Sequence, residues 1–301
     1  MNSRKGKKSS NNSGNRSLSG KKRGGSNKGS GRGFSKERRK YIDYVDSKKK
    51  GDPLPSFNED AVRLNKFLSN AGICSRREAD VLIKTGVVTV NGEIVTEMGY
   101  KVKPGDVIKY DGATINAETK RYVLLNKPKG VLTTMDDPMG RKTVMGLVRK
   151  ACKERVYPVG RLDKETTGLL LFTNDGDLAK KLTHPKFKAS KVYQVELDKK
   201  ITPGDLRKLV SGIELEDGTT RFDAAEFIDD EDARLVGVEL HSGKNRIVRR
   251  SFEALGFKVL KLDRVTFAGL TKKDLPRGRY RHLTEKEVAF LKMSRNTSRT
   301  I

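Results

Sequence analysis

The first fifty residues contain almost nothing that a folded domain could bury. Between residues 2 and 40 the only large apolar side chains are Leu18 and Phe34. The first fifty residues also hold 17 Lys and Arg against 3 Asp and Glu. A Gly-, Ser- and Lys-rich stretch of this kind cannot offset its conformational entropy by burial. Residues 1–56 are therefore predicted to form a disordered polybasic tail.

The charge of the whole chain points to a polyanionic partner. The 64 Lys and Arg against 38 Asp and Glu give a net charge of +26, and more than half of this excess lies in the first fifty residues. The tail could raise RNA affinity by releasing counterions from phosphates. It could equally be a solubilising extension, and we expect no catalytic role for it.

Several classes of protein are excluded at this stage. The cysteines at 74 and 152 and the histidines at 184, 241 and 282 are far apart, so neither a disulfide framework nor a zinc site is expected. Apolar runs such as Leu169–Phe172 are far shorter than the roughly 18 residues of a membrane span. We therefore expect no metal and no membrane partner, and a reducing compartment, the cytoplasm.

A small α+β unit is predicted over residues 61–110. Leu64, Phe67, Leu68 and Ala71 recur at helical spacing. Ser75 and Glu78 have the spacing of a capping box, which predicts the start of a second helix. Short strands are predicted over residues 87–90, 94–95 and 107–108. Residues 111–120 are predicted to be a polar linker.

The basic residues of this unit suggest an RNA-binding surface. Arg76 and Arg77 lie in the first turn of the second predicted helix, where a cation opposes the helix dipole but a docked phosphate would be well held. Arg63 and Lys66 flank the apolar stripe of the first helix. The alternative interpretation is an ordinary solvated basic face.

Four segments of this unit resemble the RNA-binding module first named in small-subunit ribosomal protein four. They are Arg63–Leu68, Ala71–Ala79, Gly86–Val88 and Val90–Gly92. The resemblance implies binding of structured RNA, with Arg63, Lys66, Arg76 and Arg77 as contact residues, and it implies no particular chemistry.

In the remaining chain, a polar loop next to a predicted buried strand contains the clearest candidate for a functional carboxylate. Asp163 lies between Arg161 and Lys164 and shortly precedes the apolar segment Leu169–Thr173. Nearby cations keep a carboxylate ionised at neutral pH. The sequence alone leaves open whether this is a functional acid or a structural salt bridge.

Two further segments combine strands with aromatic or basic side chains. Tyr193 is predicted on the interior side of the strand Lys191–Leu197, either as a stacking platform or as a core residue. The strand Leu235–Leu240 precedes a basic segment that begins a helix reaching about Leu255. Its arginines at 246, 249 and 250 are predicted to project on one side, as a phosphate-facing surface or as a solvated stripe.

Five motifs in this order resemble those of pseudouridine synthases of the RsuA/RluB type. They are Lys127–Gly130, Gly160–Asp163, Thr166–Gly176, Lys191–Tyr193 and Gly243–Arg250. The resemblance extends from residue 61 to about 292, although Ile247 and Ser251 replace the more common Gln and Met. It implies an α+β catalytic domain with a largely antiparallel sheet over residues 121–293, a tail over 294–301, and isomerisation of uridine in ribosomal RNA without a cofactor.

The resemblance also implies roles for individual residues. Asp163 would be the essential carboxylate, as nucleophile or as stabiliser of a charged sugar intermediate. Arg249 would be its ion-pair partner, with Arg246 as the alternative. Tyr193 would stack on the uracil and could move a sugar proton. The supporting and RNA-holding candidates are Arg161, Lys127, Lys129, Lys244 and Asn245.

The main competing hypothesis is a non-catalytic RNA-binding factor of ribosome assembly. The charge, the tail and the first unit would suffice for it, but Asp163 in its motif argues against it. A methyltransferase would need a Gly-rich cofactor loop, which we do not find. We expect a monomer that acts on ribosomal RNA or a ribosomal precursor particle, with large-subunit RNA favoured and small-subunit RNA left open.

Overall fold

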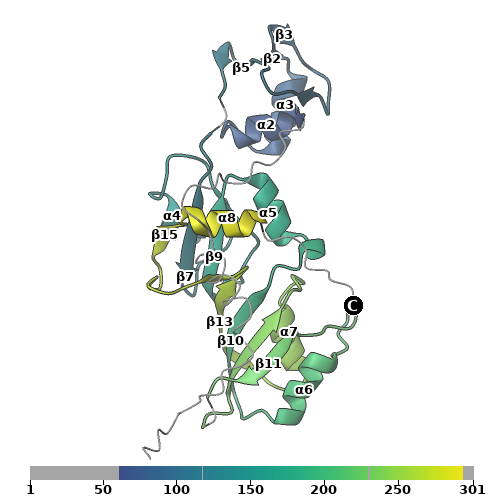
Figure 1. Ribbon diagram of the computed structural model, residues 1–301, viewed down its shortest axis with the longest axis vertical. Coiled ribbons are helices and arrows are strands. Elements are labelled where there is room, and N and C mark those ends of the chain that lie inside the picture. Colours follow the sequence, from purple (N-terminus) through teal and green to yellow (C-terminus); the bar gives the residue numbers. More distant parts are fainter. Residues whose placement is uncertain (1–60, 117, 230, 294–301) are drawn as a thin grey trace, which may run out of the picture. The chain divides into compact units, whose positions relative to one another are not determined.

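The computed structural model describes residues 61–116, 118–229 and 231–293, and Figure 1 shows their helices and strands. The predicted tails over residues 1–56 and 294–301 lie outside the described residues. Helices and strands are mixed along the chain, which confirms the predicted α+β class.

The part before residue 115 contains two helices and short strands. Its helices are α2 (Leu64–Asn70) and α3 (Arg76–Lys84). Its strands are β1 (Val62–Arg63), β2 (Val88–Val90), β3 (Glu93–Ile94), β4 (Lys101–Val102), β5 (Ile108–Tyr110) and β6 (Ala113–Thr114). β1 pairs with β4, and the others form a sheet in the order β3-β2-β5-β6. Leu64, Leu68 and Ile83 pack with Val88 and Val90 in one core.

The predicted start of α3 is confirmed in detail. The Ser75 backbone N–H donates to Glu78 Oε2 at 2.7 Å, and the Glu78 N–H donates to Ser75 Oγ at 3.3 Å. This reciprocal pair satisfies two N–H groups that would otherwise lack a partner at the helix terminus. The first turn of α3, which carries Arg76 and Arg77, is thereby fixed by local sequence.

One strand lies inside the segment predicted to be a linker. β6 pairs antiparallel with β5, with Tyr110 opposite Ala113. Asp111 and Gly112 connect the two strands with φ values of 47° and 75°, the positive pair that a tight hairpin turn requires. An Asp-Gly dipeptide is a strong hairpin signal, and the prediction overlooked it.

From residue 121 onwards, the described chain forms a nine-stranded sheet whose main order is β11-β12-β10-β13-β9-β7-β15. Its strands are β7 (Tyr122–Lys127), β8 (Tyr157–Pro158), β9 (Thr167–Thr173), β10 (Lys191–Leu197), β11 (Ala224–Phe227), β12 (Leu235–Leu240), β13 (Val259–Phe267), β14 (Leu270–Thr271) and β15 (Tyr280–His282). Among these described strands only β9 and β13 pair in parallel, which confirms the predicted largely antiparallel sheet.

Helices cover parts of both faces of this sheet. They are α4 (Val144–Val148), α5 (Gly176–Thr183), the 3₁₀ turn η1 (Pro185–Phe187), α6 (Pro203–Ser211), α7 (Ile247–Ala254) and α8 (Glu285–Met293). Side chains of β9 alternate between two cores, with Leu170 and Phe172 in one and Leu169 and Leu171 in the other. Burial on both faces explains why the segment is apolar throughout.

The parallel pairing of β9 with β13 depends on a glycine. Gly168 has a φ of +106°, and a Cβ placed on it would lie 2.3 Å from the backbone oxygen of Arg264. No other residue permits this approach without a shift of backbone. Gly168 therefore fixes where β9 begins, and with it the position of the loop that precedes β9.

An acidic group on β13 gives a prediction about stability. Burial acts to raise the pKa of Asp263, but hydrogen bonds and charges from Arg277 and Lys272 outweigh it and lower the pKa from 3.8 to about 2. A carboxyl with a lowered pKa stabilises the fold above its unfolded pKa and loses this contribution as the pH falls towards 2. Asp263→Asn should therefore lower the free energy of unfolding by about 2 kcal/mol near pH 7, and by about half as much near pH 3.

Urea unfolding followed at both pH values measures this difference. Glu216→Gln, which changes an exposed carboxylate, is the control and should leave both values nearly unchanged. If Asp263→Asn lowers the free energy of unfolding equally at both pH values, the lowered pKa of Asp263 is not the source of the stabilisation.

Candidate active site

A cavity of about 580 Å³ lies where three loops meet strands β10 and β13. Its wall includes residues of the loop that follows β7, of the loop 160–166 and of the segment 242–248. Among the predicted site residues, the structure places Arg161, Asp163, Tyr193, Lys244, Asn245 and Arg246 on this wall. It places Lys127, Lys129 and Arg249 outside the lining.

Lys127 stabilises the loop that carries Asp163 by hydrogen bonds to the main chain of that loop. The Lys127 side chain is fully buried, and its Nζ donates to the carbonyl oxygens of Asp163 at 3.1 Å and Thr166 at 2.8 Å. It also donates to those of Pro128 and Lys164, both at 3.2 Å. Burial lowers the pKa of Lys127 to about 8, while the negative charge of Asp163 opposes this shift. The structure thus gives Lys127 an anchoring role in place of the predicted RNA contact.

Lys127→Met should slow the reaction without weakening RNA binding. Loss of the ammonium group frees the loop carbonyls, and a displacement of Asp163 by an ångström is expected to cost about 10- to 100-fold in rate. Single-turnover rates and RNA dissociation constants of the purified variant separate the two effects.

Lys129→Met is the matched control for this variant. Lys129 is exposed and lies 3.2 Å from Glu165 in a surface ion pair, so its replacement should affect RNA affinity more than rate. Weaker RNA binding by Lys127→Met with an unchanged single-turnover rate would restore the original interpretation of Lys127 as an RNA contact.

Tyr193 lies on the interior face of β10, as predicted. It is 9 % exposed, packs in the same core as Val195 and also lines the cavity that contains Asp163. On the neighbouring strand its partner is Arg264. The ring is therefore held rigidly while one part of it faces the cavity.

The arginines of α7 do not share one face, contrary to the prediction. Arg249 is 7 % exposed and donates from Nη1 to the Val259 carbonyl at 2.9 Å. Arg246 has a φ of +48°, precedes the helix and lies 3.6 Å from Glu253. Arg250 pairs with Asp217 at 2.9 Å. The left-handed backbone at Arg246 breaks the helical spacing on which the prediction relied.

Of the two arginines considered as partners for Asp163, Arg249 has the more suitable environment. Burial lowers its pKa and the charge of Arg246 adds to this, whereas the negative charge of Asp163 acts through space in the opposite direction. Its Nε is buried and has no hydrogen-bond partner within the described residues. Among the described residues Asp163 forms no ion pair with Arg249 or Arg246, so the predicted pair stays a prediction. The burial of Arg249 and its unused donor favour it over the exposed Arg246.

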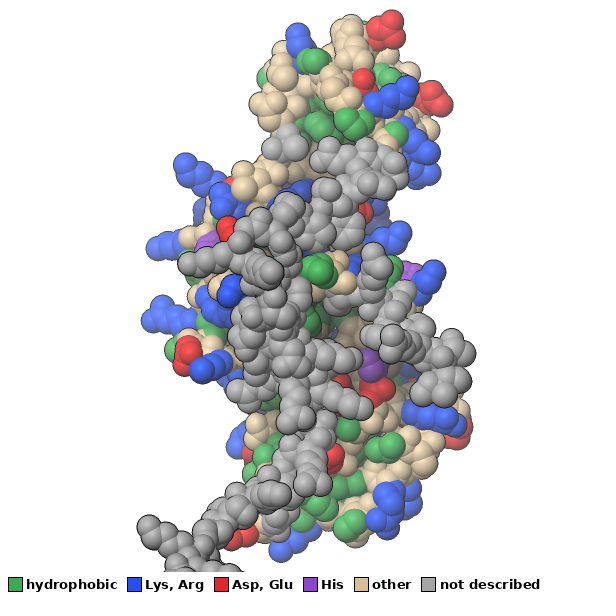
Figure 2. Space-filling model, viewed as in Figure 1, with side chains coloured by type: hydrophobic (Ala, Val, Ile, Leu, Met, Phe, Trp, Pro, Cys, Tyr) green, Lys and Arg blue, Asp and Glu red, His purple; other side chains and the backbone are tan. Residues whose placement is uncertain are grey.

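The remaining predicted RNA contacts lie on accessible surfaces. Lys244 donates from Nζ to the Asp217 carbonyl at 2.8 Å, and Arg161 and Asn245 are exposed. Arg63, Arg76 and Arg77 are exposed and Lys66 is half-buried. Figure 2 shows Lys and Arg side chains along the visible face, with Asp and Glu side chains among them.

The cations of the cavity wall include some that were not identified from the sequence. Lys191 and Arg264 both line the cavity, Lys191 from β10 and Arg264 from β13. Lys191 belongs to the Lys-Val-Tyr motif, where alternation already placed it on the same face as Tyr193. Arg264 gave no signal of its own, because its position opposite Tyr193 depends on long-range strand pairing.

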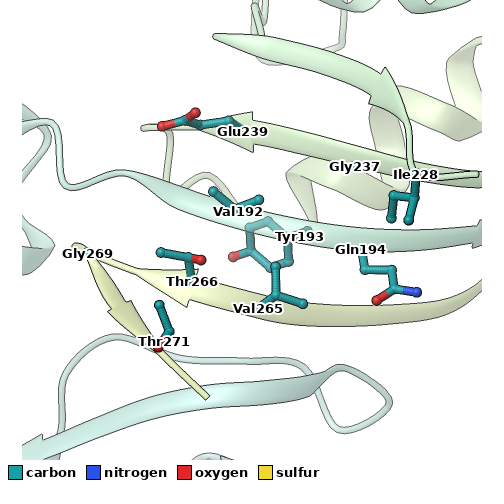
Figure 3. Close-up of a pocket in the computed structure, with 10 residues that line it drawn as sticks. All are labelled: Val192, Tyr193, Gln194, Ile228, Gly237, Glu239, Val265, Thr266, Gly269 and Thr271. Atoms are coloured by element: carbon teal, nitrogen blue, oxygen red, sulfur yellow. The ribbon is translucent and has the colours of Figure 1, made fainter. Parts of the chain in front are cut away.

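A second, smaller cavity of about 240 Å³ lies along β10, β12 and β13 (Figure 3). Val192, Gln194, Glu239 and Thr266 contribute to its lining. Tyr193 also belongs to this lining, between Val192 and Gln194 on β10. Nothing in its lining resembles the carboxylate and cation arrangement around Asp163.

Within residues 61–116, 118–229 and 231–293, no group of three or more His, Cys, Asp or Glu side chains is arranged to hold a metal ion. No helix in the same ranges is long and apolar enough to cross a membrane.

Comparisons with known proteins show which families the chain resembles. Residues 121–254 match the family model of RNA pseudouridylate synthases, and residues 62–108 match that of the S4 domain. The chain is 44 % identical to "Ribosomal large subunit pseudouridine synthase B" of Bacillus subtilis, over 76 % of this chain and 95 % of the relative. It is 37 % identical to a Vibrio cholerae protein of the same name, over 76 % and 74 %. A crystal structure described as a pseudouridylate synthase matches with a TM-score of 0.55 and 30 % identity, over 76 % of this chain and 99 % of that one.

Proposed function

Because the chain belongs to the RNA pseudouridine synthase family, we propose that it converts a specific uridine of large-subunit ribosomal RNA to pseudouridine, with Asp163 as the essential carboxylate. The observation that carries the proposal is the placement of Asp163. It lies on a loop that Lys127 holds by main-chain oxygens, and it opens onto a cavity shared with Tyr193.

The reaction exchanges one bond of the sugar for another. The bond between C1′ and N1 of the uracil breaks, the base turns while held, and C1′ bonds to C5, which loses its proton while N1 gains one. No electrons are gained or lost overall. Asp163 acts on the developing positive charge at C1′, either by bonding to it or by stabilising it. Both roles require an ionised carboxylate, and Arg249 is our candidate for the cation that pairs with it.

In this proposal Tyr193 has two roles, one in holding the uracil base and one in transferring a proton of the sugar. Its ring borders the cavity, where it can stack on the uracil. Its hydroxyl is our candidate for moving a sugar proton during the isomerisation.

The target nucleotide must leave the RNA stack to reach Asp163. Enzymes that act on a base within paired RNA turn the nucleotide out into a pocket. Arg161, Lys129, Lys244 and Asn245 hold the backbone meanwhile in this proposal, and Arg63, Lys66, Arg76 and Arg77 of the S4 domain bind a neighbouring helix. Two such contacts on one chain reinforce each other. The proposal includes a monomer that works in the cytoplasm.

Pseudouridine mapping of ribosomal RNA tests this function. RNA from cells with the wild-type gene and from cells in which the gene is deleted is treated with a carbodiimide and read by primer extension. One large-subunit site should be lost on deletion and restored by the wild-type gene. An unchanged map, together with tight RNA binding by the purified protein, would favour the assembly-factor hypothesis instead.

A further inference from the structure

Lys191 is a half-buried cation that forms no ion pair with a carboxylate among the described residues. Its Nζ donates to the carbonyl oxygens of Ala189 at 3.0 Å and His241 at 2.9 Å. An ammonium group has three N–H donors, so one is left over. Burial lowers the pKa of Lys191 to about 8, and the positive charge of Arg264 adds to this shift.

Arg264 is more deeply buried and uses even fewer of its donors. It is 2 % exposed and donates from Nε to the Leu169 carbonyl at 2.8 Å. Its Nη2 is buried without a hydrogen-bond partner among the described residues. The guanidinium carbon lies 4.5 Å from the centre of the Phe267 ring. A guanidinium has five N–H donors, so most remain unused.

Strand pairing brings the two cations onto one face of the sheet. Lys191 is the cross-strand partner of Phe267, and Tyr193 is that of Arg264. Directly opposite residues share a face, and their Cβ atoms lie about 5 Å apart. All four side chains line the cavity that contains Asp163. The two cations therefore lie beside the ring that is proposed to hold the uracil.

The nearby carboxylates are already engaged by other groups. Asp137 of the cavity wall pairs with Arg141 at 2.5 Å. Asp223, whose charge acts on Lys191, lies 2.5 Å from His241 Nδ1. Asp163 shares the cavity wall, but its charge is not among those that shift the pKa of Lys191. A buried guanidinium next to a half-buried ammonium is costly without an anion, and a bound anion would offset that cost.

We propose that Lys191 and Arg264 together form a binding site for one phosphodiester group of the flipped nucleotide. The proposal rests on the proposed function, because RNA supplies the ligand. Phosphates are the only anionic groups of an RNA substrate, and a guanidinium beside an ammonium suits phosphate oxygens. The site would hold the backbone at a fixed distance from Tyr193, so that C1′ of the sugar faces Asp163.

Single-phosphate neutralisation tests this site. The probe is a short synthetic RNA that contains the mapped uridine, made with a neutral methylphosphonate at each phosphate next to that uridine in turn. At one position, neutralisation should weaken binding to the wild-type protein by roughly 10- to 100-fold, as expected for loss of charge-assisted hydrogen bonds. If no adjacent phosphate is sensitive in the wild-type protein, the proposal is overturned.

Variants then ask whether Lys191 and Arg264 contact that phosphate. With Lys191→Met, neutralising the sensitive phosphate should cost several-fold less than in the wild-type protein, because only Arg264 then contacts the charged phosphate. Lys150→Met, which changes an exposed lysine outside the cavity, should keep the full wild-type sensitivity. Equal sensitivity in Lys191→Met and the wild-type protein would exclude Lys191 from the site.

Arg264 is tested with the conservative variant Arg264→Lys, because loss of the charge at this buried position could prevent folding. It keeps the charge with fewer donors, so it should retain part of the discrimination against the neutral phosphate. Conversion of the unmodified RNA by the wild-type protein is measured alongside. Absence of conversion would count against the proposed function, whereas conversion without a sensitive phosphate would count only against this site.

Discussion

Asp163→Asn is expected to reduce pseudouridine formation by at least about 10³-fold, since loss of a group that acts directly on the reacting centre removes most of the catalysis. Asn has nearly the same shape but can neither carry the negative charge nor bond to C1′. The main-chain contacts from Lys127 do not involve the side chain of residue 163, so the loop should keep its position. Single-turnover assays on the mapped RNA measure the loss.

The Asp163→Asn result is informative only if RNA binding is retained. The dissociation constant should stay within about threefold of wild type, because an isosteric change in the cavity removes no phosphate contact. Glu165→Gln is the matched control, since it changes an exposed carboxylate on the same loop and should leave the rate nearly unaltered. A near-normal rate for Asp163→Asn would reject the proposed mechanism.

Tyr193→Phe is expected to lower the rate by roughly 10²- to 10⁴-fold, the usual contribution of a positioned acid or base. Phe keeps the ring and hence the packing with Val195, so RNA affinity and thermal stability should change little. The measurements are the single-turnover rate across pH, the dissociation constant and a thermal unfolding curve.

Tyr193→Leu separates the two roles assigned to this residue. It removes both the hydroxyl and the aromatic face, so it should weaken RNA binding as well as the rate. If Tyr193→Phe is nearly as active as wild type while Tyr193→Leu is not, the ring serves for stacking alone and another group must move the proton.

Local signals in the sequence predicted much of the fold. The capping box at Ser75 and Glu78 is complete within four residues, and the structure contains it. The all-apolar segment after Asp163 predicted a strand buried on both faces, which is β9. In each case neighbouring residues determine the structure, so no distant contact had to be known.

Features that depend on distant contacts could not be predicted in this way. Lys127 resembles a surface lysine in the sequence, and only the fold brings the carbonyls of residues 163–166 around its ammonium group. The burial of Arg249 depends on the packing of α7 against β13, where its guanidinium donates to the Val259 carbonyl. Arg264 meets Tyr193 through pairing between strands separated by some seventy residues of chain.

The anchor beneath the Asp163 loop has a consequence for redesign of the enzyme. Lys127 donates hydrogen bonds to main-chain oxygens, which every residue type provides. The anchoring of the loop therefore does not depend on the side chains of Lys164 and Glu165. Both side chains are exposed. These two positions can be randomised to search for altered RNA preference while the carboxylate between Leu162 and Lys164 keeps its place.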